Sequence, residues 1–556
     1  MDVTQAALLR YAGLILGTTV AAGIFSYFQR TTLIGASRMI EYDLRNDLFA
    51  HLQRLPASFY DRNRTGDVMA RATNDLGNVR NVVGPGIMYF LGTAVMLVAA
   101  LAFMIRISPR LTLLSLLPLP VLSIIVNRLG TLIRKRSERV QAQFSSLSTR
   151  TQEDIAGIRV VKAYVQEEKE ASKFDRLNEE YLALNISLAK IRGFFYAMMS
   201  FLIGLATAVV LYVGGVDVIA GRITLGEFVA FNGYLAMLTW PVIALGWIVG
   251  MVEQGSASME RLNALLDAEP AAGSRAPSVP AAAARAAAAA RAREAAAGSA
   301  APAAGAAAGG IEFRGLTFSY DGRPALRGID ITVPPGSTLA VVGRTGSGKT
   351  TLVHLIARIY EPPPGTIFID GVDVRSLSLE ALRARLGFVP QDAFLFSDTM
   401  RENIAFAVPD AGEARVMEAA RRAHLLADIE DLPRGIETFV GERGVTLSGG
   451  QKQRTAIARA LLKDPSILIL DDALSNVDTY TEAIILGHLR EAIRGRTAIL
   501  ISHRLSTVQH ADQIVVLEDG AIVERGTHSE LLARRGAYAQ IYQRQQLAEE
   551  LEHVDD

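Results

Sequence analysis

Five apolar stretches in the first half of the sequence constrain the fold more than any other feature. They cover residues 12–28, 86–105, 111–126, 194–213 and 228–252. Each approaches the roughly 20 residues that a helix needs to cross the hydrocarbon core of a bilayer. The third is short and contains Pro118 and Pro120, so a buried core helix is its alternative, although its neighbours favour a membrane hairpin. The sequence therefore predicts an all-helical membrane domain with five apparent spans.

The connectors between these stretches predict their orientation. Residues 29–85 and 127–193 are long and rich in charged side chains, whereas residues 106–110 and 214–227 are short. Both long connectors should lie on one side of the membrane, together with the whole chain after the fifth stretch. That side is the cytoplasm, because the basic run 134–136 lies just beyond a span. The helical periodicity of the long connectors predicts helices that continue out of the membrane.

This orientation leaves a problem at the N-terminus. Five spans and a cytoplasmic C-terminal half would place Met1 outside the cell, yet the sequence opens without the features of a secretory signal. A sixth span before Met1 would remove the difficulty. We therefore expect that the chain lacks a first helix, through a late start or a truncation.

Composition predicts the domain organisation and excludes several functions. The chain has 556 residues, which is too long for one ordinary domain. Its 57 basic and 57 acidic residues cancel, so no global field indicates a nucleic-acid partner, and the lack of cysteine excludes disulfides and thiolate chemistry. An Ala-rich segment with three prolines and no apolar face is expected to be a flexible tether. We expect a membrane domain over 1–270, this linker over 271–310, an α/β domain over 311–545 and an acidic tail over 546–556.

A glycine-rich motif follows a predicted strand at residues 339–342. It reads Gly343, Arg344, Thr345, Gly346, Ser347, Gly348, Lys349 and Thr350, and a helical segment follows. This order of strand, GxxxxGKT and helix is the context that a phosphate-binding loop requires, and an ordinary Gly-rich turn is the alternative. Backbone N–H groups would surround the phosphates, Lys349 would reach the β and γ phosphates, and the Thr350 hydroxyl would bind Mg²⁺.

Two carboxylates end a second predicted strand, which covers residues 467–470. Asp471 and Asp472 follow it directly. Alone, such a pair could cap a helix or lie on the surface. With a phosphate loop about 120 residues earlier, a nucleotide site is favoured, and Asp471 is expected to lie near the magnesium ion.

A third motif makes a family resemblance specific. Just before the acidic strand, the sequence reads Leu447, Ser448, Gly449, Gly450 and Gln451, which matches the signature loop of ATP-binding-cassette (ABC) transporters. Residues 311–545 resemble the ATPase domain of that family, and residues 1–270 resemble the membrane domain of an exporter half-transporter of the multidrug or lipid type. Residues 440–444 resemble a loop typical of exporters. The resemblance implies a type I ABC exporter-like helical membrane domain, then an α/β P-loop ATPase domain, with ATP and Mg²⁺ as cofactors.

The resemblance also implies roles for single residues. Tyr320 would stack on adenine, with an ordinary strand Tyr as the alternative, and Thr351 would join the nucleotide-binding set. Gln391 would sense Mg²⁺ beside Thr350 and Asp471, although it could be an ordinary loop amide. His503 would contact the γ phosphate, although a lone His is more often structural. Residues 475–478 would cross a dimer interface.

Two stretches of the long connectors resemble coupling helices. They lie near residues 59–61, ahead of Thr65, Gly66 and Asp67, and near Ala163 and Tyr164. Their aromatic side chains would insert into grooves on the ATPase domains and transmit motion. Packing between the long helices is the alternative.

The family resemblance implies a dimer and makes Asp472 its main departure. In this family each ATP lies between the phosphate loop of one chain and the signature loop of the other, so one chain cannot build a site. Asp472 takes the position of the Glu that polarises the attacking water. An Asp is one methylene shorter, and misplacement by about an ångström can cost roughly a hundredfold in rate. We therefore favour a heterodimer in which this chain's own site is slow, and a homodimer is the alternative.

The predicted function is ATP-driven export of a hydrophobic or amphipathic compound, such as a drug or lipid, across the cytoplasmic membrane. The chain would be a multi-pass membrane protein in contact with lipid, with its ATPase domain in the cytoplasm and Gln391, Asp472 and His503 serving hydrolysis. An ATP-gated channel or regulatory membrane protein is the alternative. The cargo itself cannot be inferred from the sequence.

Overall fold

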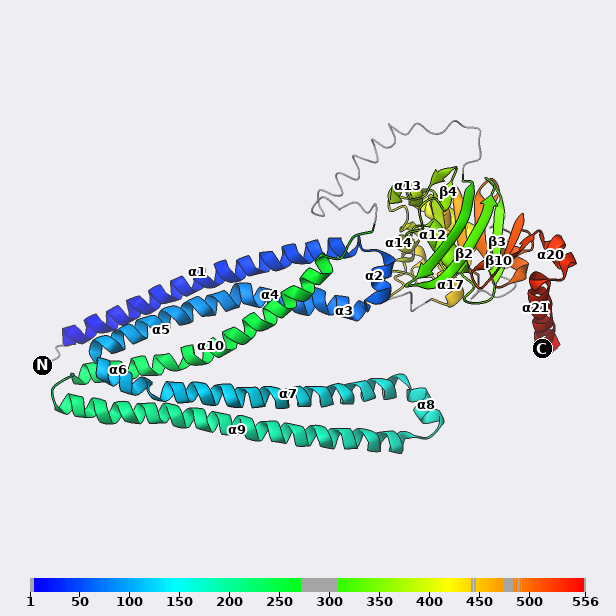
Figure 1. Ribbon diagram of the computed structural model, residues 1–556. Helices are drawn as coiled ribbons and strands as arrows, with labels where there is room; N and C mark the ends of the chain where they lie inside the picture. Colours follow the sequence, from blue (N-terminus) through cyan, green and yellow to red (C-terminus); the bar gives the residue numbers. More distant parts are fainter. Residues whose placement is uncertain are drawn as a thin grey trace, which may run out of the picture. The chain divides into compact units, whose positions relative to one another are not determined.

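The computed structural model describes residues 5–271, 309–441, 444, 447–474, 484–485, 487, 491 and 493–554. The chain divides into two units (Figure 1). Residues 1–47 and 69–266 form the helical unit, and residues 48–68 and 267–556 form the α/β unit. Most of the predicted linker, Glu442 and Arg443 of the predicted exporter loop, and residues 475–478 lie outside the described residues.

Long helices dominate the first half of the chain because its apolar stretches run into helical connectors without a break. The π-helical turns η1 and η2 interrupt the segment before α5. The elements are α1 (Gln5–Leu52), α2 (Ala57–Arg62), α3 (Thr65–Ala70), η1 (Arg71–Asp75), α4 (Leu76–Asn81), η2 (Val82–Gly86), α5 (Ile87–Ile107), α6 (Pro109–Leu116), α7 (Pro118–Ala156), α8 (Ile158–Ala163), α9 (Glu167–Ile219) and α10 (Leu225–Leu266).

Each predicted apolar stretch lies within these helices, with one difference in the third. By length and composition, three helical segments of the described chain can cross a membrane, namely 5–52, 65–107 and 167–219, and residues 225–238 add a shorter apolar helix. The third stretch is divided, since α6 ends at Leu116 and α7 begins at Pro118. Proline has no backbone N–H and fits the first turn of a helix, so it favours a new helix start there.

The helical unit packs through α5, α6, α9 and α10. Its core includes Met104 and Leu111, which are fully buried, together with Val210 and Phe231. Long side chains on α1 such as Leu16 and Phe25 are instead exposed, as expected for a surface that faces lipid. Helices α7 and α9 run side by side and are joined through α8 (Figure 1).

A buried polar cluster fastens η1 to α10 within the helical unit. Nε of Arg261 donates to Oδ2 of Asp75 over 2.9 Å, and the Ser258 hydroxyl donates to Oδ1 of Asp75 over 2.9 Å. Asn78 in turn donates to the Ser258 hydroxyl over 3.0 Å. Asp75 is only 7% exposed, so these partners satisfy a carboxylate that would otherwise be costly to bury.

Two sheets form the centre of the α/β unit. The antiparallel sheet has the order β2-β1-β4-β5, and the larger sheet has the order β10-β9-β3-β8-β7-β6, in which only β10 runs antiparallel to its neighbour. The strands are β1 (Ile311–Tyr320), β2 (Arg323–Val333), β3 (Thr338–Gly343), β4 (Ile367–Ile369), β5 (Val372–Asp373), β6 (Leu386–Val389), β7 (Ile467–Asp471), β8 (Thr497–Ile501), β9 (Gln513–Glu518) and β10 (Ala521–Gly526).

The helices of the α/β unit are short and enclose three apolar cores. One core fills the space between the two sheets, a second lies among β6, β7 and the helices α14 to α17, and a third packs α20 and α21 on β3 and β9. The described helices are α12 (Lys349–Ile356), α13 (Leu379–Ala384), α14 (Met400–Ala405), α15 (Glu413–Arg422), α16 (Leu426–Glu430), η3 (Gly435–Glu437), α17 (Gly449–Leu462), α19 (Leu505–Val508), α20 (His528–Arg534) and α21 (Ala537–Val554).

Candidate nucleotide site

Four parallel strands bring the predicted site residues to one edge of the larger sheet. In register, Val341 of β3 pairs with Ile501 of β8, Ile501 pairs with Asp471 of β7, and Val389 of β6 pairs with Leu470. Because the carboxyl ends of parallel strands meet at one edge, the loops after β3, β6, β7 and β8 lie together. Ligands of open α/β sheets bind at that edge.

The loop between β3 and α12 needs its glycines for both space and backbone conformation. A Cβ atom at Gly343 would lie 2.3 Å from the Leu517 carbonyl oxygen, and one at Gly348 would lie 2.6 Å from the Ala325 carbonyl oxygen. Gly348 also has a φ of 97°, and Gly346 has a φ of 84°, which L side chains rarely adopt. At Gly343 and Gly348 the loop therefore approaches its neighbours too closely for any other residue.

Lys349 holds its ammonium group inside this loop. Nζ donates to the carbonyl oxygens of Gly343 over 2.9 Å and of Arg344 over 2.8 Å, and the residue is 6% exposed. Burial lowers the pKa of Lys349, while the nearby carboxylates of Asp472 and Asp471 act in the opposite direction. The loop thus contains a buried cation next to the N-terminus of α12, the end at which helix N–H groups lack intrahelical partners.

Asp471 and Thr350 form an oxygen-rich corner next to the loop. The Thr350 hydroxyl donates to Oδ1 of Asp471 over 3.2 Å. Oδ2 of Asp471 and Oγ of Ser347 are buried and have no hydrogen-bond partner among the described residues. Burial raises the pKa of Asp471 to about 6. An unpartnered carboxylate oxygen beside a hydroxyl is the donor set that Mg²⁺ prefers, so these residues fit that ion.

Asp472 is held by hydrogen bonds to the end of β8 and to the loop that follows it. Its backbone N–H donates to the Ile501 carbonyl oxygen over 2.8 Å, and its Oδ1 accepts from the His503 backbone N–H over 3.4 Å. The residue is 7% exposed and has a φ of 48°. Asp is among the few non-glycine residues that adopt this left-handed conformation readily.

Gln391 and His503 lie on the loops that follow β6 and β8, and both are exposed. Gln391 comes two residues after the end of β6. The backbone of His503 connects to Asp472 through its N–H and accepts from the Gln545 side chain through its carbonyl oxygen. The strands therefore bring both residues to the edge where Asp471 and Asp472 lie.

Tyr320 is the last residue of β1 and contacts α12. Its hydroxyl donates to the Thr351 hydroxyl over 3.4 Å. Its ring makes T-shaped contacts with Phe318 and Tyr360, each with centroids 5.0 Å apart. Burial raises the pKa of Tyr320, so the phenol stays protonated at neutral pH.

The signature residues Ser448 and Gln451 form hydrogen bonds with each other and with α16 rather than with the phosphate loop. Ser448 caps α17 and forms a capping box with Gln451, which places Gly449 and Gly450 in the first turn. Nε2 of Gln451 donates to Asp428 over 3.1 Å, and Asp428 also binds Arg454 through two guanidinium nitrogens. Asp428 could not be predicted from the sequence, because its partners are more than 20 residues away and it belongs to no motif.

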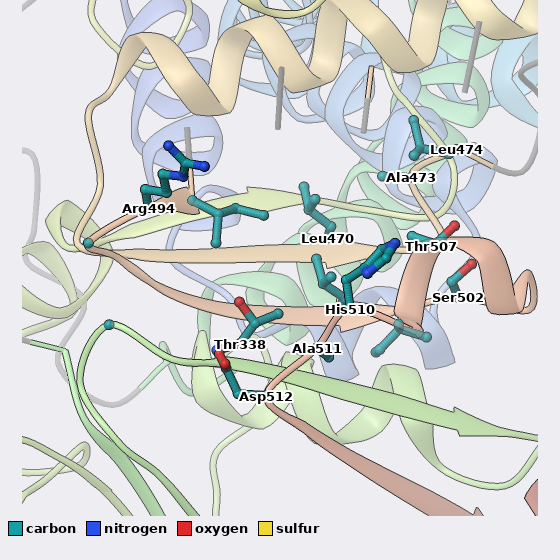
Figure 2. Close-up of a pocket in the computed structure, with 15 residues that line it drawn as sticks. Thr338, Leu470, Ala473, Leu474, Arg494, Ser502, Thr507, His510, Ala511 and Asp512 are labelled. Carbon is teal, nitrogen blue, oxygen red and sulfur yellow. The ribbon is translucent and has the colours of Figure 1, made fainter. Parts of the chain in front are cut away.

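A cavity beside β8 is separate from the phosphate loop. It has a volume of about 280 Å³, and Figure 2 shows Arg494, His510 and Ser502 among the side chains around it. Lys349, Asp471 and Asp472 are not among its lining residues. It therefore does not overlap the phosphate loop.

A helical unit with membrane-spanning helices, followed by an α/β unit with a phosphate loop and a signature helix, defines an ATP-driven membrane transporter subunit. The chain belongs to the ABC transporter family. Residues 1–242 match the family model of the ABC transporter transmembrane region, and residues 326–475 match the ABC transporter family model.

Similar proteins place it among exporters. The multidrug resistance-like ATP-binding protein MdlA of Escherichia coli is 38% identical over 100% of this chain and 90% of its own length. The ATP-dependent lipid A-core flippase of Syntrophus aciditrophicus is 37% identical over 94% of this chain and 83% of its length. A solved bacterial Atm1-family ABC exporter with ATP bound has a TM-score of 0.75 and 29% identity, covering 98% of this chain and 92% of that chain.

These findings confirm the predicted fold class and the predicted activity. The chain is an ABC exporter half-transporter, a membrane protein with an ATP-binding domain on the cytoplasmic side whose ATPase activity is coupled to transport. Half-transporters of this family generally dimerise.

Proposed function

We propose that this half-transporter exports a hydrophobic or amphipathic compound, either a drug or a lipid, across the cytoplasmic membrane. The names of its relatives carry the proposal, since they include a multidrug resistance-like protein and a lipid A-core flippase. The scarcity of charged side chains in its apolar stretches supports a cargo of that kind.

Transport into inverted membrane vesicles tests this cargo class. With ATP, vesicles that contain the assembled transporter should accumulate a fluorescent drug or a labelled lipid, and vesicles with Lys349→Ala should not. Accumulation that does not depend on ATP would contradict the proposal. A current across the membrane without accumulation would instead indicate a gated channel.

The roles of the site residues follow from their chemistry. Lys349 and the backbone of residues 343–348 would hold the phosphates, and Tyr320, with Thr351, would hold the adenine end. Asp471, Thr350 and Gln391 would hold Mg²⁺, which neutralises charge on the phosphate oxygens during transfer. The buried Oδ2 of Asp471, which lacks a partner among the described residues, supports that assignment. Ser448, Gly449, Gly450 and Gln451 would complete the site of a second chain.

We further propose that hydrolysis at this chain's own phosphate loop is slow. Asp472 is one methylene shorter than Glu, and its Oδ1 accepts a hydrogen bond from the His503 backbone N–H. General-base catalysis needs the carboxylate within about 3 Å of the water or one intermediary away. His503 would still contact the γ phosphate. ATP binding would be unaffected, because Asp472 contributes no group to the loop that holds the phosphates.

The partner that fits these features is a different half-transporter. A chain with an intact signature sequence and a short catalytic carboxylate can complete a fast site on a partner that carries Glu.

We also propose the domain boundaries that the sequence indicates. They are a membrane domain (1–270), a linker (271–310), an ATPase domain (311–545) and a tail (546–556).

Purification of the chain alone tests the heterodimer. We expect the isolated chain to hydrolyse ATP at least about 10-fold more slowly than the complex purified with its partner from the native membrane, because neither site then has a Glu. The measurement is steady-state ATPase activity in nanodiscs, with the oligomeric state followed by mass. Two-fold dimers of this chain alone with ordinary transport-coupled ATPase activity would contradict the heterodimer.

A further inference from the structure

A short helix of the first connector contacts two residues that adjoin Tyr320. This helix, α2, belongs to the α/β unit although it lies far from it in sequence. Oδ2 of Asp61 accepts a hydrogen bond from the Tyr360 hydroxyl over 2.7 Å. Arg62 forms an ion pair with Asp321, which directly follows Tyr320. Adjacent residues of one helix thus reach two neighbours of Tyr320.

Tyr360 connects Asp61 to Tyr320, since its hydroxyl is bonded to Asp61 and its ring packs against Tyr320. The two rings form a T-shaped pair with centroids 5.0 Å apart and planes at 85°. Such pairs stabilise each other beyond the burial of their surface area when their geometry is kept. The hydrogen bond to Asp61 fixes the hydroxyl end of Tyr360, and therefore fixes the ring that supports Tyr320.

The two contacts differ in strength. Arg62 and Asp321 have exposed side chains, at 67% and 69%, and exposed ion pairs contribute little. The bond between Tyr360 and Asp61 joins a neutral donor to a charged acceptor, and such bonds are stronger than neutral ones. Burial and the Asp61 carboxylate raise the pKa of Tyr360, so its hydroxyl remains a donor at neutral pH. Asp61 is therefore the residue whose loss should matter.

We propose that Asp61 is a positioning residue for the base of the nucleotide, which acts by holding Tyr360 against Tyr320. The affinity for adenine then depends on the seating of α2 on the α/β unit. By thermodynamic reciprocity, the bound base favours that seating by the same factor, whereas a triphosphate without a base does not. The inference rests on the proposed function, because it takes Tyr320 as the residue that stacks on adenine.

The experiment compares two ligands on the full-length, assembled transporter. Equilibrium binding of ATP and of inorganic tripolyphosphate, both with Mg²⁺, separates the base from the phosphates. Asp61→Ala should weaken ATP binding about 3- to 10-fold and leave tripolyphosphate binding unchanged. Tyr360→Phe should have the same effect, and the double variant should lose no more than either single variant. Asp61→Asn keeps an acceptor oxygen and should restore most of the affinity.

Matched variants separate this inference from its premise. Asp67 is an exposed acid on the neighbouring helix α3, and Asp67→Ala should leave both affinities unchanged. Equal losses for ATP and tripolyphosphate, or additive losses in the double variant, would overturn the role of Asp61. If Tyr320→Ala weakens ATP binding and Asp61→Ala does not, this inference alone fails. If Tyr320→Ala leaves ATP affinity unchanged, the assignment of the adenine site fails with it.

Discussion

Replacing Lys349 by Ala should abolish measurable ATP binding at this chain's phosphate loop, a loss of about 100-fold or more. The Lys349 ammonium is buried and held by the carbonyl oxygens of Gly343 and Arg344, inside the loop that would surround the phosphates. Removing one partner of a buried, hydrogen-bonded charge pair costs about 2–5 kcal/mol or more, and each 1.4 kcal/mol is a tenfold change in affinity. Binding of a labelled ATP analogue to this chain measures the effect.

Lys463 provides the matched control for that variant. Its ammonium is also partly buried and donates to backbone carbonyl oxygens, including that of Leu386, but it takes no part in the phosphate loop. Lys463→Ala therefore removes a similar group at a different place and should keep the ATP affinity. Unchanged affinity in Lys349→Ala would rule out the loop as the phosphate site. Equal losses in both variants would indicate general damage to the domain.

Extending Asp472 by one methylene should raise the ATPase turnover of the assembled transporter. If the carboxylate stops about an ångström short of the attacking water, Asp472→Glu should increase the rate about 10- to 100-fold at this chain's site. ATP affinity should stay the same, because the phosphates are held by Lys349 and the loop backbone. Single-turnover hydrolysis with a partner whose own site is inactivated measures the rate at this site alone.

The backbone at position 472 calls for a control of its own. Asp472 has a φ of 48°, and a Glu there is expected to cost stability, since Asp tolerates the left-handed region better than Glu. Asp464 has a φ of 54° and lies before β7, away from the loop, so Asp464→Glu imposes a similar strain without the chemistry. It should not change turnover. A rate in Asp472→Glu that is equal to or below the wild-type rate would contradict a geometry-limited site.

Local sequence predicted the parts of the site that depend on neighbouring residues. The glycines predict the phosphate loop, and at two of them the structure shows a steric reason, because a Cβ atom at Gly343 or Gly348 would collide with a carbonyl oxygen. The strand before Asp471 was predicted from its apolar run, and it is fully buried. Backbone conformation and strand burial are short-range properties, so a short segment determines them.

Other parts of the site could not be predicted, because they join residues that are distant in sequence. Asp428 supports Gln451 and Arg454 of the signature helix, yet it belongs to no motif. The sequence indicated that residues near Phe59 could serve coupling, but it did not indicate that Asp61 binds Tyr360, which lies 299 residues later. The third apolar stretch predicted part of a membrane hairpin, but it did not indicate that α6 ends at Leu116 and that α7 begins at Pro118.

The amino-acid sequence by itself determined the class of this protein: apolar stretches long enough to span a bilayer, a phosphate loop, an acidic strand and a signature motif in the order of an ABC exporter half. Those features arise from residues adjacent in the chain. Only the tertiary structure decided that the Asp472 carboxylate meets the backbone of His503 and that Asp61 reaches the ring beside Tyr320. Both contacts exist because sheet register and helix packing bring together residues that are far apart in the sequence. A pattern of neighbouring residues does not predict such a contact.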